Sequence, residues 1–113
     1  MRTLEESPAL TRDYGKVASD VKHRLLEELP GAEVILYGSV SRGEEDEDSD
    51  IDLLVLTPSE VHWQEQWRIR GLFTDLSIES DLLISFQFMT KTFWEEHPNM
   101  PFIQEVRQDG VVI

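Results

Sequence analysis

Residues Tyr37–Leu56 have the sequence YGSVSRGEEDEDSDIDLLVL and connect two apolar runs of the chain. The first run, Val34–Tyr37, predicts a short buried strand. Gly38 ends this strand, because a residue without a side chain lets the backbone turn and approach a ligand closely. Ser39–Arg42 predicts a short helical turn with free N–H groups that attract an anion, and residues 44–49 predict an acidic loop. The segment therefore predicts a turn from a strand into an anion-binding site.

Two aspartates begin the second predicted strand, Asp50–Leu56. Residues two apart in a strand project from the same face, so Asp50 and Asp52 point the same way with backbones about 6.6 Å apart. The residue between them, Ile51, and the odd-numbered residues after it are apolar and face the other way. The strand therefore carries a pair of carboxylates at its exposed end, an arrangement suited to a hard cation.

A calcium loop of the EF-hand type is excluded, although Asp46, Asp48 and Asp50 alternate as they do at the start of one. The sixth position of such a loop would be Ile51 in place of Gly. The twelfth would be Thr57 in place of Glu.

Helical and strand patterns fill the rest of the chain. Apolar residues recur every three or four positions over 9–29, which predicts an amphipathic helix ended by Pro30-Gly31. A long helix is expected over 60–77, with Ser59 as its N-cap and a break near Gly71. The remaining expected elements are a strand at Asp81–Phe88, helices at Thr92–Glu96 and Pro101–Asp109, and a last strand at Val111–Ile113.

The lengths of the connections predict how the strands pair. About ten residues link the first two strands, which favours antiparallel pairing, and the helix before the third strand favours a parallel crossover. Asp81, at the start of the third strand, would then lie at the same edge as Asp50 and Asp52, about 4.8 Å away across neighbouring strands. Glu79 is the alternative third acid. We therefore expect three carboxylates to converge beside Gly38.

The composition is that of a small acidic domain. The chain has 113 residues, 40% of them hydrophobic, so we expect one domain over 1–113 with a flexible lead-in at 1–8. A net charge of -13 disfavours an extended nucleic-acid surface and is compatible with a partner that has a basic face. The chain has no Cys, which excludes disulfides and thiolate sites. No signal sequence and no membrane-spanning stretch is found, so a cytoplasmic protein is expected.

Gly38-Ser39, followed after ten residues by Asp50-Ile51-Asp52, resembles the signature of minimal nucleotidyltransferase domains of the DNA polymerase beta superfamily. Arg42-Gly43 resembles the Arg-Gly that usually follows the Gly-Ser in that family. The resemblance covers roughly residues 10–110. It implies an α+β fold, in which helices pack on a small mixed β-sheet. It also implies an enzyme that transfers a nucleoside monophosphate to an acceptor, with AMP from ATP the favoured case and pyrophosphate leaving.

The resemblance implies catalytic and metal-binding roles for Asp50, Asp52 and Asp81. Asp50 and Asp52 would bridge two Mg²⁺ ions, and Asp81 would complete the ion that lowers the pKa of the acceptor hydroxyl. Two such ions, about 3.5 to 4 Å apart, stabilise the attacking and the leaving oxygen of a phosphoryl displacement.

The same resemblance implies that Gly38 and Ser39 hold the terminal phosphates of ATP or another nucleoside triphosphate. Arg42 would add a bidentate phosphate contact, and an ion pair with the acidic loop is an equally good explanation of its position. Lys91 is a further candidate for a cation near the triphosphate.

Stand-alone domains of this length are similar to MntA-type antitoxins, whose partner is a helical HEPN-type ribonuclease that they modify on a tyrosine. The resemblance therefore implies a HEPN-like protein partner and, as acceptor, a protein or another hydroxyl compound, with the protein favoured. The alternative is a noncatalytic binding module of the same fold that neutralises or scaffolds a partner by contact alone. Trp63 and Trp94 are candidate interface residues, whereas Trp67 is expected to pack into the core.

Overall fold

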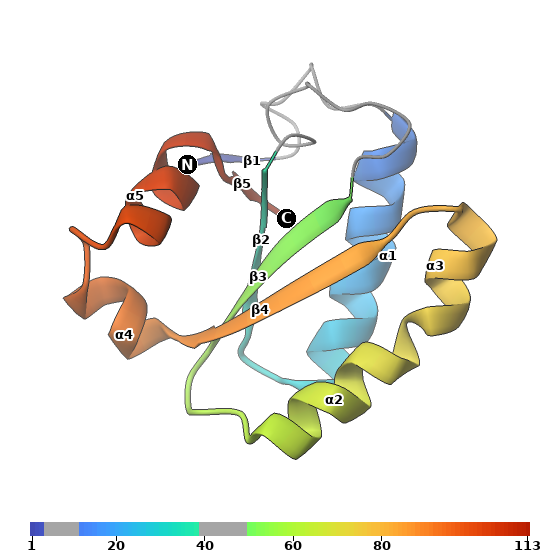
Figure 1. The fold of residues 1–113 in the computed structure, drawn as a ribbon, viewed down its shortest axis with the longest axis horizontal. Coiled ribbons are helices and arrows are strands. Elements are labelled where there is room, and N and C mark those ends of the chain that lie inside the picture. The colour runs from blue at the N-terminus through green and yellow to red at the C-terminus, as the bar shows by residue number, and fades with distance from the viewer. Residues whose placement is uncertain (4–11, 39–49) are drawn as a thin grey trace.

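The computed structural model describes residues 1–3, 12–38 and 50–113, and it shows a five-stranded sheet in the order β1-β5-β2-β3-β4 with helices on both faces (Figure 1). The strands are β1 (Arg2–Thr3), β2 (Glu33–Tyr37), β3 (Ile51–Thr57), β4 (Ile84–Thr90) and β5 (Val111–Val112). The helices are α1 (Arg12–Glu28), α2 (Trp63–Leu72), α3 (Thr74–Ser80), α4 (Lys91–Glu96) and α5 (Pro101–Asp109). The expected α+β fold with a small mixed sheet is confirmed.

The strands pair as the connection lengths predict. β2 and β3 are antiparallel, with Tyr37 opposite Asp52, and β3 and β4 are parallel, with Asp52 opposite Ser85. β5 pairs antiparallel with the other side of β2, and β1 pairs parallel with β5. The crossover through α2 and α3 returns the chain to the same edge of the sheet, so the end of β2 and the starts of β3 and β4 lie together.

Alternation along β3 divides the core into two layers. Ile51, Leu53 and Val55 point into a cluster that also contains residues of α1, α2 and the start of α3. Leu54 and Leu56 point the other way, into a cluster with Trp94, Ile103 and Val106 of α4 and α5. Asp52 has the same parity as Leu54 and therefore lies on the α4 and α5 face of the sheet.

The long predicted helix is interrupted, as expected near Gly71. α2 ends at Leu72 and α3 begins at Thr74, with the fully buried Phe73 between them. The prediction that Ser59 is the N-cap is wrong. The cap is His62, whose Nδ1 accepts a hydrogen bond from the Gln64 amide at 3.3 Å.

Of the flexible lead-in expected at 1–8, Arg2–Thr3 form β1 beside β5, and residues 4–8 lie outside the described residues. The start of the first predicted helix, the Ser39–Arg42 turn and the acidic loop fall within 4–11 and 39–49, outside the residues described. None of the helices in the described ranges has the length and apolar character needed to cross a membrane.

Candidate active site

Gly38 brings the backbone after β2 against the side chain of Asp52. Its φ is +83°, a left-handed conformation that residues with a side chain rarely adopt. A Cβ atom added to Gly38 would lie 2.5 Å from Oδ2 of Asp52, closer than real Cβ contacts come. Both the backbone conformation and the available space therefore require glycine here. The predicted turn at Gly38 is confirmed, and its close approach to a ligand stays a prediction.

The two aspartates at the start of β3 interact electrostatically. Asp52 is half-buried, and its pKa is raised above the ordinary aspartate value first by burial and then by the negative charge of Asp50. Both effects penalise the ionised carboxylate. A divalent cation between the two side chains would offset both, because it supplies the opposite charge that Asp52 lacks.

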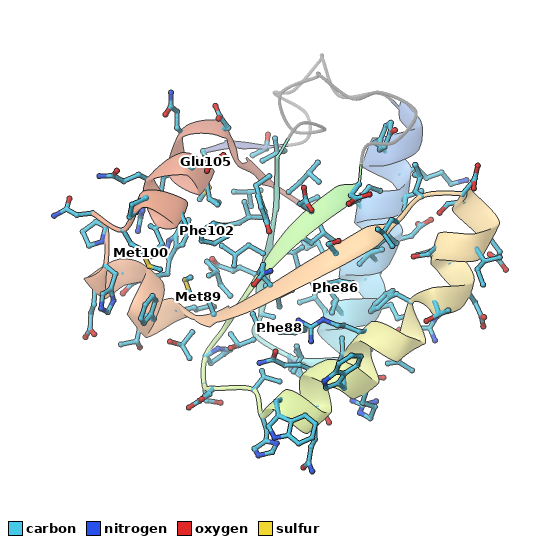
Figure 2. The ribbon with its side chains drawn as sticks, in the orientation of Figure 1. Phe86, Phe88, Met89, Met100, Phe102 and Glu105 are labelled. Atoms are coloured by element: carbon cyan, nitrogen blue, oxygen red, sulfur yellow. The ribbon has the colours of Figure 1, made fainter. Side chains whose placement is uncertain are left out.

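Tyr37 forms one wall of the same site, in the strand next to Asp52. Burial, then the charges of Asp52 and Glu105, raise the pKa of the Tyr37 phenol to about 12, so it remains a neutral hydroxyl at physiological pH. Its ring meets Phe102 edge to face, with centroids 5.4 Å apart and planes at 89°. Figure 2 shows Phe102 and Glu105 on α5, which closes this side of the site. Sequence reasoning missed this wall, and the pairing of Tyr37 with Asp52 was the signal that could have indicated part of it.

Asp81 does not lie in a strand, so the expectation of a third strand beginning at Asp81 is wrong. α3 continues to Ser80, and Asp81 follows it with a left-handed φ of 56°. The amide of Leu82 then bonds to the carbonyl of Ser77 at 3.2 Å, which completes the end of the helix. β4 begins three residues later than predicted, at Ile84.

The later start of β4 changes which residues lie beside the aspartates. Ser85 is opposite Asp52, and the carbonyl of Leu83 accepts the amide of Ile51 at 2.8 Å. Neither Leu83 nor Ser85 is acidic. Glu79, the alternative third acid, lies within α3 and lines a pocket between α1 and α3.

Over residues 1–3, 12–38 and 50–113, no three His, Cys, Asp or Glu side chains are grouped closely enough to hold a metal ion. The expected convergence of Asp50, Asp52 and Asp81 is therefore not found in this part of the chain. The two carboxylates that do interact still fit magnesium, which protein sites commonly hold through one or two carboxylates plus water and substrate phosphates.

The predicted phosphate-binding side chains are not all placed. Ser39 and Arg42 lie outside the described residues. Lys91 does not lie near the site, because it pairs with Glu33 at 3.7 Å, at the opposite end of β2 from Gly38. The suggestion that Lys91 contacts a triphosphate is therefore wrong.

The tryptophans differ from their expected environments. Trp94 is 6% exposed and lies under the guanidinium of Arg107, 4.4 Å from the ring centroid, so it is a core residue and not an interface candidate. Trp63 and Trp67 are 61% and 66% exposed on α2. The expectation of packing for Trp67 is wrong, because the buried face of α2 is formed at Ile69.

Comparison with protein families agrees with the geometry. The family model described as a nucleotidyltransferase domain matches residues 18–109 of this chain. The candidate protein adenylyltransferase MJ0141 of Methanocaldococcus jannaschii is 36% identical over 80 residues, which are 71% of this chain and 76% of that protein.

Two solved toxin–antitoxin structures have a similar fold. One, crystallised with AMP-PNP, superposes with a TM-score of 0.57 at 20% identity, covering 82% of this chain and 69% of that chain. The other, a mutant of the toxin–antitoxin MntA-HpeT, has a TM-score of 0.56 at 20% identity, covering 84% and 70%. At this identity the likeness concerns the fold alone.

Proposed function

The chain belongs to the nucleotidyltransferase domain family, and from that premise we propose that it transfers a nucleoside monophosphate to a hydroxyl group on a protein. AMP from ATP is the favoured case. The acceptor oxygen forms a bond to the α-phosphorus, and the bond from the α-phosphorus to the bridging oxygen breaks, so that pyrophosphate leaves. The hydroxyl proton passes to solvent or to a carboxylate of the site.

One observation carries the proposal, namely the glycine turn held against a half-buried aspartate. A structural strand end needs neither a left-handed Gly38 nor a carboxylate oxygen 2.5 Å from the position that a Cβ atom of residue 38 would take. A site that must admit phosphate oxygens beside a carboxylate needs both, because the backbone then leaves room for the substrate.

Asp50 and Asp52 are the proposed magnesium ligands. When bound, magnesium supplies Lewis-acid stabilisation of the negative charge on the phosphate and on the leaving group. Asp52 has to be ionised for this role, and Asp50 keeps the local potential negative enough to attract a cation. Gly38 lets the backbone pass close to Asp52, and Ser39 and Arg42 are proposed to hold the terminal phosphates.

The relatives support the choice of nucleotide and acceptor. MJ0141 carries the name of a protein adenylyltransferase, and one fold neighbour is a toxin–antitoxin crystallised with AMP-PNP, an ATP analogue. We therefore propose ATP as the donor and a partner protein as the acceptor, with this chain as the antitoxin of a pair. A helical, HEPN-like toxin is the proposed partner.

The test is transfer of label from α-labelled ATP to the product of a neighbouring gene, in the presence of magnesium. Asp50→Asn and Asp52→Asn should each lower the transfer rate at least a thousandfold, with the fold retained by circular dichroism. Asp75→Asn is the matched control, because Asp75 is an exposed carboxylate in the first turn of α3, and it should change the rate less than twofold.

Chelation of magnesium should abolish the transfer, and adding the metal back should restore it. If the wild-type chain and the Asp52→Asn variant bind the partner equally well, and the wild-type chain transfers no label, the noncatalytic binding module is correct and the proposal fails.

Asp81→Asn tests whether the third predicted carboxylate takes part. Since the structure places Asp81 after α3 and outside any three-carboxylate group of the described residues, we expect this variant to retain at least one tenth of the transfer rate. A loss as large as that of Asp52→Asn would mean that Asp81 approaches the site when the nucleotide binds.

A further inference from the structure

α2 is apolar on two sides. Its inner side carries Ile69, which is fully buried, and the fully buried Phe73 follows the helix. Its outer side carries Trp63 and Trp67, which are 61% and 66% exposed. A helix that packs on the core with one side usually has polar residues on the other. The outer side of α2 therefore has the composition of a second packing surface.

The two tryptophans and Gly71 lie in one line along this outer side. Residues four apart in a helix lie one above the other, and Gly71 follows Trp67 by the same four residues by which Trp63 precedes it. Long side chains of a helix lean toward its N-terminus, so we expect the turn after Trp67 to stay uncovered. Among the described residues beyond its own helical turn, a Cβ atom added to Gly71 would meet nothing within 4 Å. The line therefore consists of two large side chains followed by a notch at Gly71.

This spacing is self-complementary about a two-fold axis. When α2 of a second copy lies antiparallel to α2 with the axis at Trp67, each Trp63 falls opposite Gly71 of the other copy. The two Trp67 side chains then meet at the axis. An unrelated partner would not require a large and a small residue at equal distances on either side of Trp67. The pattern therefore favours a second copy of this chain as the occupant.

The charges of α2 permit this contact in a strongly acidic chain. The net charge of -13 opposes self-association, but α2 contains one glutamate and two arginines and has a net charge of +1. Arg68 is paired with Glu65 and Glu28, and Arg70 bonds to the Phe86 carbonyl, so both arginines are already engaged within one copy. The repulsion between two copies therefore comes from residues away from the contact, where salt screens it.

The size of the patch predicts a weak dimer. A buried tryptophan removes about 150 to 250 Å² from water, and four tryptophans meet across the axis. Since about three fifths of each of these side chains is exposed, roughly 400 to 600 Å² of tryptophan surface is available to the contact. Standard interfaces bury at least about 1,200 Å² in total. We therefore expect a dissociation constant of roughly 10 to 100 μM.

We propose that two copies of this chain associate through α2 about a two-fold axis at Trp67, with each Trp63 in the notch at Gly71 of the other copy. This association goes beyond the proposed transfer reaction and does not depend on it. α2 follows the end of β3 that is remote from Asp52 and lies at the lower edge of the ribbon in Figure 1. The contact therefore does not involve Asp52 or Gly38.

Sedimentation equilibrium of the full chain, from about 1 to 500 μM, tests the association. We expect a monomer–dimer equilibrium that tightens at least twofold between about 0.05 and 0.5 M salt, because salt screens the repulsion. Tryptophan emission should shift to shorter wavelength over the same range of concentration, since Trp63 and Trp67 leave water and Trp94 is already buried. Asp52→Asn should dimerise as the wild type does, so a failure here is distinct from a failure of the proposed reaction.

Gly71→Gln separates folding from association. Gly71 does not have a positive φ, and a side chain there has free space, so this variant should melt at the same or a higher temperature than the wild type. The new side chain fills the notch and should weaken dimerisation at least tenfold. Trp67→Gln should weaken it at least tenfold as well. Ile78→Gln is the matched control, because Ile78 is 73% exposed on α3, and it should change the dissociation constant less than twofold.

Four results would overturn the proposal. The first is a chain that stays monomeric at every concentration, and the second is a dimer that Gly71→Gln or Trp67→Gln leaves as tight as the wild type. The third is a dimer that weakens as salt is added, which would mean that opposite charges hold it and not the tryptophans. The fourth is an equal loss in Ile78→Gln and Trp67→Gln, which would place the contact on α3.

Discussion

The two faces of the sheet differ in how completely they are covered. On the α1, α2 and α3 face, Ile51, Leu53 and Val55 of β3 are fully buried in one continuous cluster. On the α4 and α5 face, Leu54 and Leu56 are buried, but Asp52 is half-buried and Gln87 of β4 is exposed. The same strand thus supplies a closed core on one side and a partly open surface on the other. The candidate active site lies on this second, partly open face, where Tyr37 meets Phe102 of α5.

We expect the residues of the closed face to stabilise the fold and the residues around Asp52 to act in the proposed transfer reaction. A change on the closed face should lower stability and leave the site intact, because Asp52 lies on the other face of the sheet. A change beside Asp52 should act on chemistry and leave the core intact. The predictions below test this separation.

The largest effect is expected at Gly38. Gly38→Ala places a methyl group 2.5 Å from Oδ2 of Asp52 and forces a residue with a side chain into a left-handed φ, so the transfer rate should fall at least a hundredfold. Gly31→Ala is the matched control, since Gly31 has φ +84° and meets only Pro58, at 3.1 Å. The control should lose stability in thermal melts and keep its rate per folded molecule. Equal loss of rate in both variants would contradict the assignment of Gly38 to the site.

The next effect concerns the closed face. Leu53→Ala removes a fully buried side chain and should lower the free energy of unfolding by about 3 kcal/mol, within the range for buried leucines. The transfer rate per folded molecule should stay within twofold of the wild type. Leu54→Ala should cost a similar free energy in urea titrations but also reduce the rate, because Leu54 lies on the face of Asp52. If Leu53→Ala alone reduced the rate, the two faces would not be separable.

A smaller effect is expected for stability at Asp52. Because its pKa in the folded chain is raised above the ordinary aspartate value of 3.8, the folded state binds this proton more tightly than the unfolded state, and stability is lost as pH rises above that value. In the absence of metal, Asp52→Asn should match the wild type below pH 3.8 and exceed it in melting temperature near pH 7. The gain should be below about 1 kcal/mol, since the side chain is half exposed, or roughly 5 °C at most. A lower melting temperature at pH 7 would refute the burial and repulsion invoked for Asp52.

The smallest effect is in the titration of Tyr37. Its phenol should ionise with a pKa of about 12 in a stopped-flow pH jump read by tyrosinate absorbance, and Tyr37→Phe should remove that step. Glu105→Gln and Asp52→Asn should each move the pKa of the phenol back toward its ordinary value of 10.0, because each removes a negative charge near the phenol. An unchanged pKa in Glu105→Gln would mean that α5 does not close the site.

Most of the fold could be predicted from the sequence because local patterns and connection lengths were consistent. The short link between the first two strands predicted the antiparallel pair, and the helix before the third strand predicted the parallel crossover. The pair of aspartates beside Gly38 followed from the period of a strand. These features depend on residues close together in the sequence.

The rest depended on tertiary contacts that no local pattern records. β4 begins at Ile84 and not at Asp81, because α3 continues to Ser80 and ends with a left-handed residue. Asp81 tolerates a left-handed conformation better than most residues, and it therefore ends α3 and does not begin β4. The Tyr37, Phe102 and Glu105 wall required knowledge of where α5 packs. The exposed Trp67 shows that a large aromatic residue in a helix need not face the core.

The pairing of β1 with β5 has a consequence for synthesis. Arg2 lies opposite Val111, and Val111 also pairs with Leu36 of β2. Until Val111–Val112 have been synthesised and have left the ribosome, β2 therefore lacks its second neighbour and β1 has none. We expect final closure of the sheet to wait until the C-terminal strand emerges, and chaperone binding to the ribosome-bound chain to be strongest just before that point.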